Sequence, residues 1–230
     1  MQYKHIESAV FLRRPNRFIA EVLLRGKTET VHVKNTGRCR ELLLPGTTVY
    51  LSAAENPDRK TKYDLVAVEK QRSGDTLCIN MDSQIANDVA QEWLQTGALF
   101  GENAHIRREV SHGRSRFDFY IEQGERKIFL EVKGCTLEQD GVALFPDAPT
   151  QRGVKHITEL TACLQDGYEA YILFVLQMKG VHVFRPHDAM HPQFGDALRK
   201  ARQAGVHILA MDCAVAPDSI RIDAPVAVRL

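Results

Sequence analysis

The chain has 230 residues, of which 44% are hydrophobic and 26% are charged, an ordinary balance for a globular protein with one large domain or two small ones. No apolar run is long enough to span a bilayer and no secretion signal opens the sequence, which argues against membrane and exported proteins. The five cysteines are scattered and form no CxxC motif, so we expect reduced thiols in a cytoplasmic protein rather than a disulfide framework or a zinc ribbon.

Charge is distributed unevenly along the chain, although the net charge is only +1. Residues 1–80 contain 14 Lys and Arg against 9 Asp and Glu, whereas residues 81–230 contain 16 against 20. This asymmetry suggests a basic module that holds a polyanion and an acidic module that binds metal. Chance placement of charges explains an excess of this size equally well.

The first 80 residues have the pattern of a small β-barrel. Alternating or β-branched segments, separated by turn signals, predict five strands at 17–24, 29–34, 48–53, 63–69 and 75–80. Five short strands with one longer connection suit a barrel of the OB type, and an SH3-like barrel is the nearest alternative.

From about residue 81 the pattern changes to mixed α/β, which predicts two domains, 1–80 and 81–230. Thr150 is a suitable N-cap for the second of three helices, and Gly205 a suitable end for the third. The predicted elements are a helix at 83–99, a hairpin at 117–133, a helix at about 151–165, a strand at 171–177, a helix at 195–205 and a strand at 206–215. They should form helices packed on a mixed central sheet.

The hairpin has an unusual distribution of charge. With its turn centred on Gly124 and Glu125, Asp118 lies opposite Glu131, and Lys133 shares their face two residues further on. Arg116, opposite Lys133, shares that face too. The other face is predicted to be the core and carries Phe117, Phe119, Ile121, Leu130 and Val132.

Two opposed carboxylates destabilise a sheet unless something offsets their repulsion. A hard divalent cation such as Mg²⁺ is the natural candidate, because it prefers carboxylate oxygens. The alternative is a solvated face on which Arg116 and Lys133 neutralise Asp118 and Glu131, since exposed ion pairs are common and nearly neutral in energy.

Asp118 and the tripeptide Glu131-Val132-Lys133 resemble the motif of the PD-(D/E)xK nuclease superfamily. A longer set of segments resembles the sugar fermentation stimulation protein A family along nearly the whole chain. These segments are NTG (35–37), RSRFDF (114–119), EVKGCTL (131–137) and FPDAPTQRGVKHITEL (145–160).

The resemblance implies an N-terminal OB-like domain joined to a nuclease-like domain, in a family described as DNA-binding and as regulating sugar (maltose) metabolism. It also implies roles for individual residues. Asp118, Glu131 and Lys133 would be catalytic, with Mg²⁺ or Mn²⁺ held by Asp118, Glu131 and, from the preceding helix, Glu92. Glu92 and a further candidate, Glu109, are equally well explained as solvated glutamates.

A second set of residues is predicted to bind nucleic acid. On the helix after residue 150, Arg152 and Lys155 could hold a phosphate, and the alternative is a surface helix with ion pairs such as Lys155 with Glu159. The resemblance favours the functional interpretation of Arg152 and Lys155. His156, on the same face, could equally be packed in an interface. The full predicted set is Arg13, Arg14, Arg17, Lys34, Asn35, Arg38, Arg40, Arg116, Arg152 and Lys155.

We therefore expect a cytoplasmic DNA-binding protein with a Mg²⁺-dependent phosphodiesterase site. One alternative is a non-enzymatic DNA-binding regulator that retains the nuclease-like fold. Another is an RNA-binding or RNA-processing protein, which matched DNA and RNA strands would distinguish through the 2′-hydroxyl.

Overall fold

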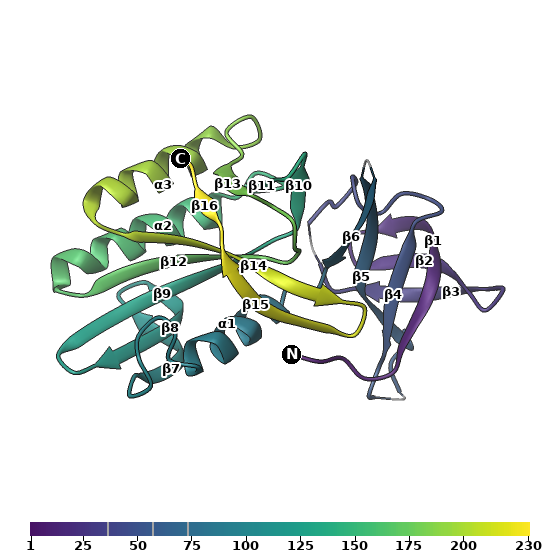
Figure 1. Cartoon of the computed structure of the whole chain (residues 1–230), viewed down its shortest axis with the longest axis horizontal. Helices are drawn as coiled ribbons and strands as arrows, with labels where there is room; N and C mark the ends of the chain where they lie inside the picture. The colour runs from purple at the N-terminus through teal and green to yellow at the C-terminus, as the bar shows by residue number, and fades with distance from the viewer. Residues whose placement is uncertain (36, 57, 73) are drawn as a thin grey trace.

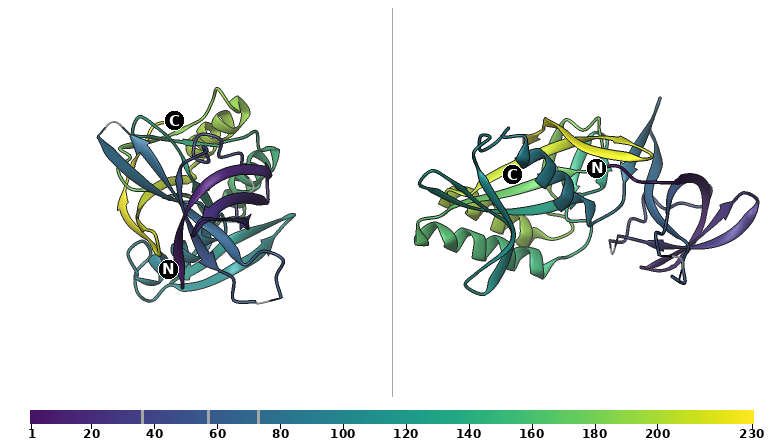
Figure 2. Two further views of the ribbon diagram at one scale, coloured as in Figure 1. Left: turned by 90° about the vertical axis from the view of Figure 1, so that its right-hand side faces the viewer. Right: turned by 90° about the horizontal axis from the view of Figure 1, so that it is seen from below.

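The computed structural model describes residues 1–35, 37–56, 58–72 and 74–230. The chain forms two lobes, a smaller one from its N-terminal third and a larger one from the remainder (Figure 1). The right-hand view in Figure 2 shows the same division. Within the described residues, no helix is long and apolar enough to cross a membrane.

The smaller lobe is a β-barrel whose strand order is β3-β2-β1-β4-β5-β6, with an additional parallel pairing of β3 and β5 that closes the sheet. All five predicted strands are present, and β1 is a sixth that the sequence pattern does not reveal. Two register shifts interrupt its pairing with β2, so apolar and polar residues lose their alternation. The strands are β1 (Ile6–Asn16), β2 (Ile19–Leu24), β3 (Lys27–Val33), β4 (Thr48–Ala53), β5 (Tyr63–Arg72) and β6 (Asp75–Asn80).

The larger lobe is built on a six-stranded sheet of order β15-β14-β12-β9-β8-β7, in which β12 runs parallel to both β9 and β14. Its strands are β7 (His105–His112), β8 (Ser115–Gln123), β9 (Arg126–Cys135), β12 (Glu169–Leu176), β14 (His207–Ala216) and β15 (Ser219–Pro225). A second, small sheet contains β10 (Leu137–Gln139), β11 (Val142–Phe145), β13 (Val183–Pro186) and β16 (Ala227–Val228).

Helices cover both faces of the large sheet. On one face lies α1 (Ile85–Gln95), and on the other lie α2 (Gln151–Ala162), with a short 3₁₀ turn after it, and α3 (Pro192–Ala204) (Figure 1). The Thr150 hydroxyl accepts the Gly153 N–H at 3.0 Å, and Gly205 ends α3 with a positive φ, as the sequence predicts.

The mixed α/β class is confirmed. The sequence pattern does not predict β7, β10, β11, β13, β15 or β16. Of these strands, β7 is mostly exposed and lacks an alternating pattern.

The hairpin has the predicted register, from Gln123 opposite Arg126 to Phe119 opposite Leu130. The ladder stops one residue before the predicted pairing of Asp118 with Glu131, because an Asp118 carboxylate oxygen accepts the Val132 N–H at 2.7 Å.

The prediction of a single core face for this hairpin is wrong. Phe119 packs with the α1 side of the sheet, whereas Phe117, two residues earlier, packs with the α2 side. The side chains of β8 therefore switch to the opposite face of the sheet at Asp118. The face that carries Glu131 is covered by α2 and is not open to solvent.

A buried polar network joins the two lobes. The Gln177 side-chain amide donates to the carbonyls of Asn80 and Asp82, at 3.1 and 3.0 Å, and to the Asn80 side chain at 3.0 Å. Asp82 in turn pairs with Lys34 of the barrel at 2.5 Å. Asn80, Asp82 and Gln177 are each 1% exposed or less, so water cannot replace these bonds.

Substituting Gln177→Met should lower the free energy of unfolding by about 2 kcal/mol, because three buried acceptors lose their donor. Urea denaturation measures this change. The exposed Gln139→Met is the matched control and should change stability by less than about 0.5 kcal/mol. Equal effects of the two substitutions would contradict a role for the network.

Candidate active site

A cleft of about 730 Å³ in the larger lobe brings together several of the residues predicted from the sequence. Its walls are the beginning of α1, the strands β7, β8 and β9, and the first half of α2. The predicted residues in its lining are Asp118, Glu131, Lys133, Arg116 and Arg152, and the lining also contains Asn87, Glu109 and His156.

Asp118 lies at the irregular point of β8 and is held from two sides. One carboxylate oxygen accepts the Val132 N–H at 2.7 Å, and the other accepts the Asn87 side-chain amide at 2.8 Å. Burial raises the pKa of Asp118, and the nearby charge of Glu131 raises this pKa further. The ionised carboxylate is therefore destabilised in the folded chain, and a bound cation would relieve this cost.

Glu131 is more deeply buried, with a side chain that is 4% exposed. Its Oε1 atom lies 2.5 Å from both Lys133 Nζ and His156 Nδ1. Burial alone would raise the pKa of Glu131, but the bonds from His156 and Lys133 outweigh it and hold the pKa below its usual value. The other oxygen, Oε2, is buried and has no hydrogen-bond partner in the described structure.

The second ring nitrogen of His156 also has a hydrogen-bond partner. Its Nε2 accepts a long hydrogen bond of 3.4 Å from Arg152 Nε, which leaves Nδ1 as the donor to Glu131. The histidine thus connects a buried carboxylate to an arginine at the cleft wall.

These carboxylates fit a hard divalent cation. An unpartnered, buried carboxylate oxygen next to a second carboxylate is the donor type that Mg²⁺, Mn²⁺ and Ca²⁺ prefer. No group of three or more His, Cys, Asp or Glu side chains arranged for a metal occurs in the described part of the chain. The protein would therefore supply two carboxylates, and water or substrate oxygens would complete the coordination, as is usual for Mg²⁺.

The prediction that Glu92 joins this metal site is wrong. Only the first turn of α1 borders the cleft, and Glu92 lies further along the helix, where it binds the Met1 amino group at 2.6 Å and lines a different hollow. Glu109 does line the cleft, but it pairs with Arg116 at 3.2 Å. The helix instead contributes Asn87, which the sequence analysis did not select.

Several basic residues of the barrel that were predicted to bind nucleic acid are already engaged within the protein. Arg13 forms two hydrogen bonds to Glu21, and Lys34 belongs to the network between the lobes. The Arg14 guanidinium donates to four backbone carbonyls, those of Arg17, Asn35, Gly37 and Arg38. For Arg14 the prediction is therefore corrected to a structural role.

Asn35 is likewise internal, at 8% exposure, with its side-chain oxygen accepting the Gly37 N–H. A hydrogen bond from a backbone N–H to an asparagine side chain two residues earlier is typical of a tight turn. Thr36, between the two residues, lies outside the described residues. By contrast, Arg17, Arg38 and Arg40 are exposed, form no ion pair within the described structure and line a separate hollow of about 280 Å³.

The two residues of α2 that were predicted to bind nucleic acid, Arg152 and Lys155, also differ in their surroundings. Arg152 lines the cleft and has no carboxylate partner in the described structure, whereas Lys155 lies outside the cleft lining, is 62% exposed and sits 3.7 Å from Glu159. The interpretation of Lys155 as a surface ion pair is the one that the structure favours.

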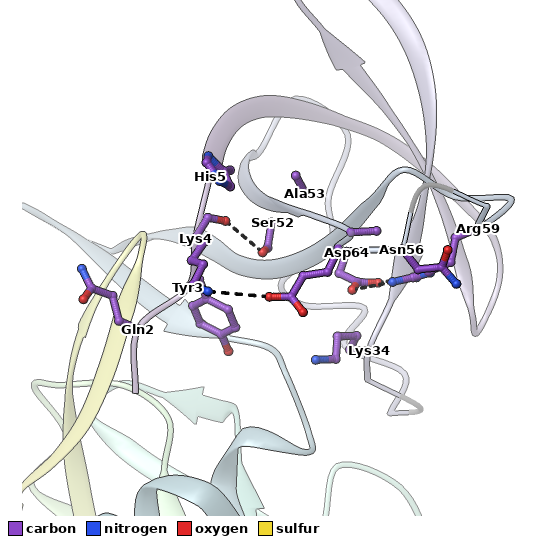
Figure 3. A pocket seen from close by; sticks show the side chains of 12 residues that line it. Gln2, Tyr3, Lys4, His5, Lys34, Ser52, Ala53, Asn56, Arg59 and Asp64 are labelled. Atoms are coloured by element: carbon purple, nitrogen blue, oxygen red, sulfur yellow. Dashed lines mark hydrogen bonds and ion pairs between the residues drawn. The ribbon is translucent and has the colours of Figure 1, made fainter.

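A hollow of about 780 Å³ below the N-terminal segment is slightly larger than the cleft (Figure 3). Its charges already have partners: Arg59 pairs with Asp64 at 2.7 Å, and Lys34 pairs with Asp82. Among the described residues, its lining contains no pair of buried carboxylates and no buried side-chain atom without a hydrogen-bond partner. This hollow is therefore a weaker candidate for an active site than the cleft.

Each of the two lobes matches a known family model. Residues 12–79 match the family model described as the SfsA N-terminal OB domain, and residues 84–219 match the sugar fermentation stimulation protein RE domain, a restriction endonuclease-like domain. The chain belongs to the sugar fermentation stimulation protein family.

Similar proteins span the whole chain. A sugar fermentation stimulation protein homolog of Desulfitobacterium hafniense is 56% identical over 100% of this chain and 99% of its own length. One from Ruminiclostridium cellulolyticum is 53% identical over 100% of both chains. A solved structure titled as Pyrococcus furiosus SfsA in complex with Ca²⁺ superposes with a TM-score of 0.88 at 29% identity, over 100% of this chain and 98% of that one.

His156→Ala should weaken Mn²⁺ or Ca²⁺ binding about 10-fold, because Glu131 loses one of the two donors that fix its carboxylate. His156→Asn should restore most of the affinity, since its amide can donate from a position close to Nδ1. Titration calorimetry without nucleic acid measures both. The exposed His105→Ala is the control, and a loss as large as that of His156→Ala would contradict the assignment.

Asp118→Asn should stabilise the metal-free protein by about 1 kcal/mol, which is a rise of ~2–4 °C in Tm. Folding raises the pKa of Asp118, so ionising this group costs stability as the pH rises above ~4. A neutral amide removes this cost once the Asn87 side chain turns over, so that its oxygen accepts the new NH2 group. Thermal denaturation at pH 7 in EDTA measures the difference. Excess Ca²⁺ should reduce or reverse it by stabilising only the wild type, and a lower Tm of the variant in EDTA would contradict the prediction.

Proposed function

We propose that this protein is a metal-dependent nuclease, which hydrolyses phosphodiester bonds of DNA in the cytoplasm with Mg²⁺ or Mn²⁺. The observation that carries the proposal is the buried, unpartnered Oε2 of Glu131 beside the destabilised carboxylate of Asp118. Keeping these two carboxylates together lowers the free energy of unfolding. A role in ligand binding explains why the chain keeps them, whereas a structural role does not.

Asp118 and Glu131 would hold the cation, and a cation there supplies Lewis-acid activation of a water molecule and of a phosphate oxygen. The chain's own groups have separate tasks. Lys133, 17% exposed and anchored to Glu131, donates to the phosphate as negative charge develops on it. Arg152, which has no carboxylate partner in the described structure, binds a neighbouring phosphate and orients the strand.

The comparisons support this reaction class. The larger lobe matches a restriction endonuclease-like family model, and the related Pyrococcus furiosus protein was solved with Ca²⁺, a hard divalent cation. The relatives' names refer to sugar fermentation. A part in regulating sugar (maltose) metabolism would then be indirect, through binding or cutting of nucleic acid. A non-enzymatic regulator and an RNA-processing protein are the two alternatives to be tested.

Cleavage of supercoiled, linear and single-stranded DNA should require Mg²⁺ or Mn²⁺ and should stop in EDTA. Asp118→Asn and Lys133→Ala should each lower the rate by ~10²-fold or more, because each removes a charge at the reacting phosphate. The matched controls are Asp140→Asn and Lys200→Ala, both exposed and away from the cleft.

The outcomes separate the three hypotheses. If the wild type binds DNA but does not cut it under any metal condition, the regulator is favoured. If only matched RNA strands are cut, the RNA-processing hypothesis is correct. If cutting persists in both cleft variants, the site has been assigned to the wrong residues.

A further inference from the structure

Three hollows adjoin one another and cross the boundary between the lobes. The cleft shares Ser83, Val132, Lys133 and Gly134 with a hollow of about 210 Å³. That hollow shares Gly37 with the third one, of about 280 Å³, which is lined by arginines of the barrel. The three hollows therefore lie in a row along the surface, here called the channel, which leads from the carboxylates, past Lys133, to the exposed Arg17, Arg38 and Arg40.

The two lobes contact each other closely in the middle of this channel. The Arg38 N–H of the barrel donates to Asp147 of the larger lobe at 3.1 Å. A Cβ atom at Gly37 would overlap the Asp147 carboxylate, so glycine allows the two surfaces to approach this closely without displacing that side chain. The middle hollow is below the ~300 Å³ of the smallest usual ligand pockets. It has room for the backbone of one strand, not for a duplex, whose major groove alone is about 12 Å wide.

The barrel end of the channel offers both kinds of contact that a single strand uses. Arg17, Arg38 and Arg40 provide positive charge that no carboxylate in the described structure neutralises. Phe18 and Leu44, which directly follow the lining residues Arg17 and Leu43, are 51% and 53% exposed. Single-strand sites combine a positive groove with aromatic rings on which bases stack, whatever their sequence. Phe18 offers such a ring, and Leu44 offers an apolar contact.

We propose that the channel binds one single strand of nucleic acid, with its bases on Phe18 and Leu44 and its phosphates on the three arginines. The strand then crosses the boundary between the lobes at Gly37 and enters the cleft, where Arg152 receives it. The substrate class is therefore a single strand, or a single-stranded end of a duplex, rather than the interior of a duplex. This inference rests on the proposed function for what happens in the cleft, but not for the binding itself.

Binding can be measured without hydrolysis, by fluorescence anisotropy in EDTA and in Ca²⁺. The probes are labelled single strands of DNA and of RNA, about 4 to 16 nucleotides long, and a blunt duplex of the longest sequence. Single strands should bind at least ~10-fold more tightly than the duplex, with affinity rising until the strand spans both lobes. The DNA and RNA arms show which of the two is preferred.

Variants on the barrel should separate charge from stacking. Arg17→Ala with Arg40→Ala should weaken binding and reduce the slope of log K against log salt by about 0.7 for each phosphate contact removed. Phe18→Ser should weaken binding ~10-fold with the slope unchanged, because stacking releases no counterions. Arg202→Ala, an exposed arginine on α3, is the matched control and should bind as the wild type does.

Crosslinking tests the continuity of the path. Photoreactive thymidines at successive positions of one strand should crosslink first to residues 37–44 and then, further along the same strand, to residues 131–156. Crosslinks to only one lobe, equal affinity for duplex, or unchanged binding by the arginine and Phe18 variants would each overturn the proposal.

The two proposals fail in different ways. If single strands bind as described but no metal supports cleavage, the channel stands and the nuclease function fails. If duplexes are cut internally with Mg²⁺ and the barrel variants have no effect, the nuclease function stands and the channel fails.

Discussion

Asp118 and Glu131 place two negative charges where water is largely excluded, and an uncompensated buried charge costs several kcal/mol. The surrounding structure supplies the compensation. Asp118 receives a backbone N–H and an amide, and Glu131 receives an ammonium and an imidazole. One oxygen of Glu131 receives nothing from the described chain. The compensation is therefore incomplete at one buried atom of a residue that lines the cleft.

The compensating groups come from three different elements, so the layers of the larger lobe have to be placed accurately. Asn87 comes from the first turn of α1, Lys133 from β9 and His156 from α2, on opposite faces of one sheet. Close approach at Gly134 is part of this placement, because a Cβ atom there would overlap the Gln177 side chain. Gln177 also bonds to the barrel, so the same residue positions β9 and the second lobe.

The hairpin could be predicted from the sequence because its turn fixes the register of every pair, and the register identified Asp118, Glu131 and Lys133. The helix residues that bind these carboxylates could not be predicted from the sequence. They depend on which turn of each helix faces the sheet, and packing decides that. The resemblance points to Glu92, whereas the turn of α1 that borders the cleft carries Asn87. Arg14 shows a second limit: an exposed-looking arginine in a basic loop binds four carbonyls, which no local pattern reveals.

The connection between the lobes decides how a substrate can be selected. Only four residues separate β6 from α1, and two of them, Met81 and Asp82, are 0% and 1% exposed. Rotating one lobe against the other would break the bonds of Gln177 and separate Lys34 from a buried carboxylate, at a cost of several kcal/mol. A hinge that closes on a substrate is therefore disfavoured. Under the single-strand proposal, selection would therefore depend on the fixed shape and charge of the surface between the lobes, and the hollow beside Gly37, which is smaller than the cleft, would restrict the substrate more than the cleft does.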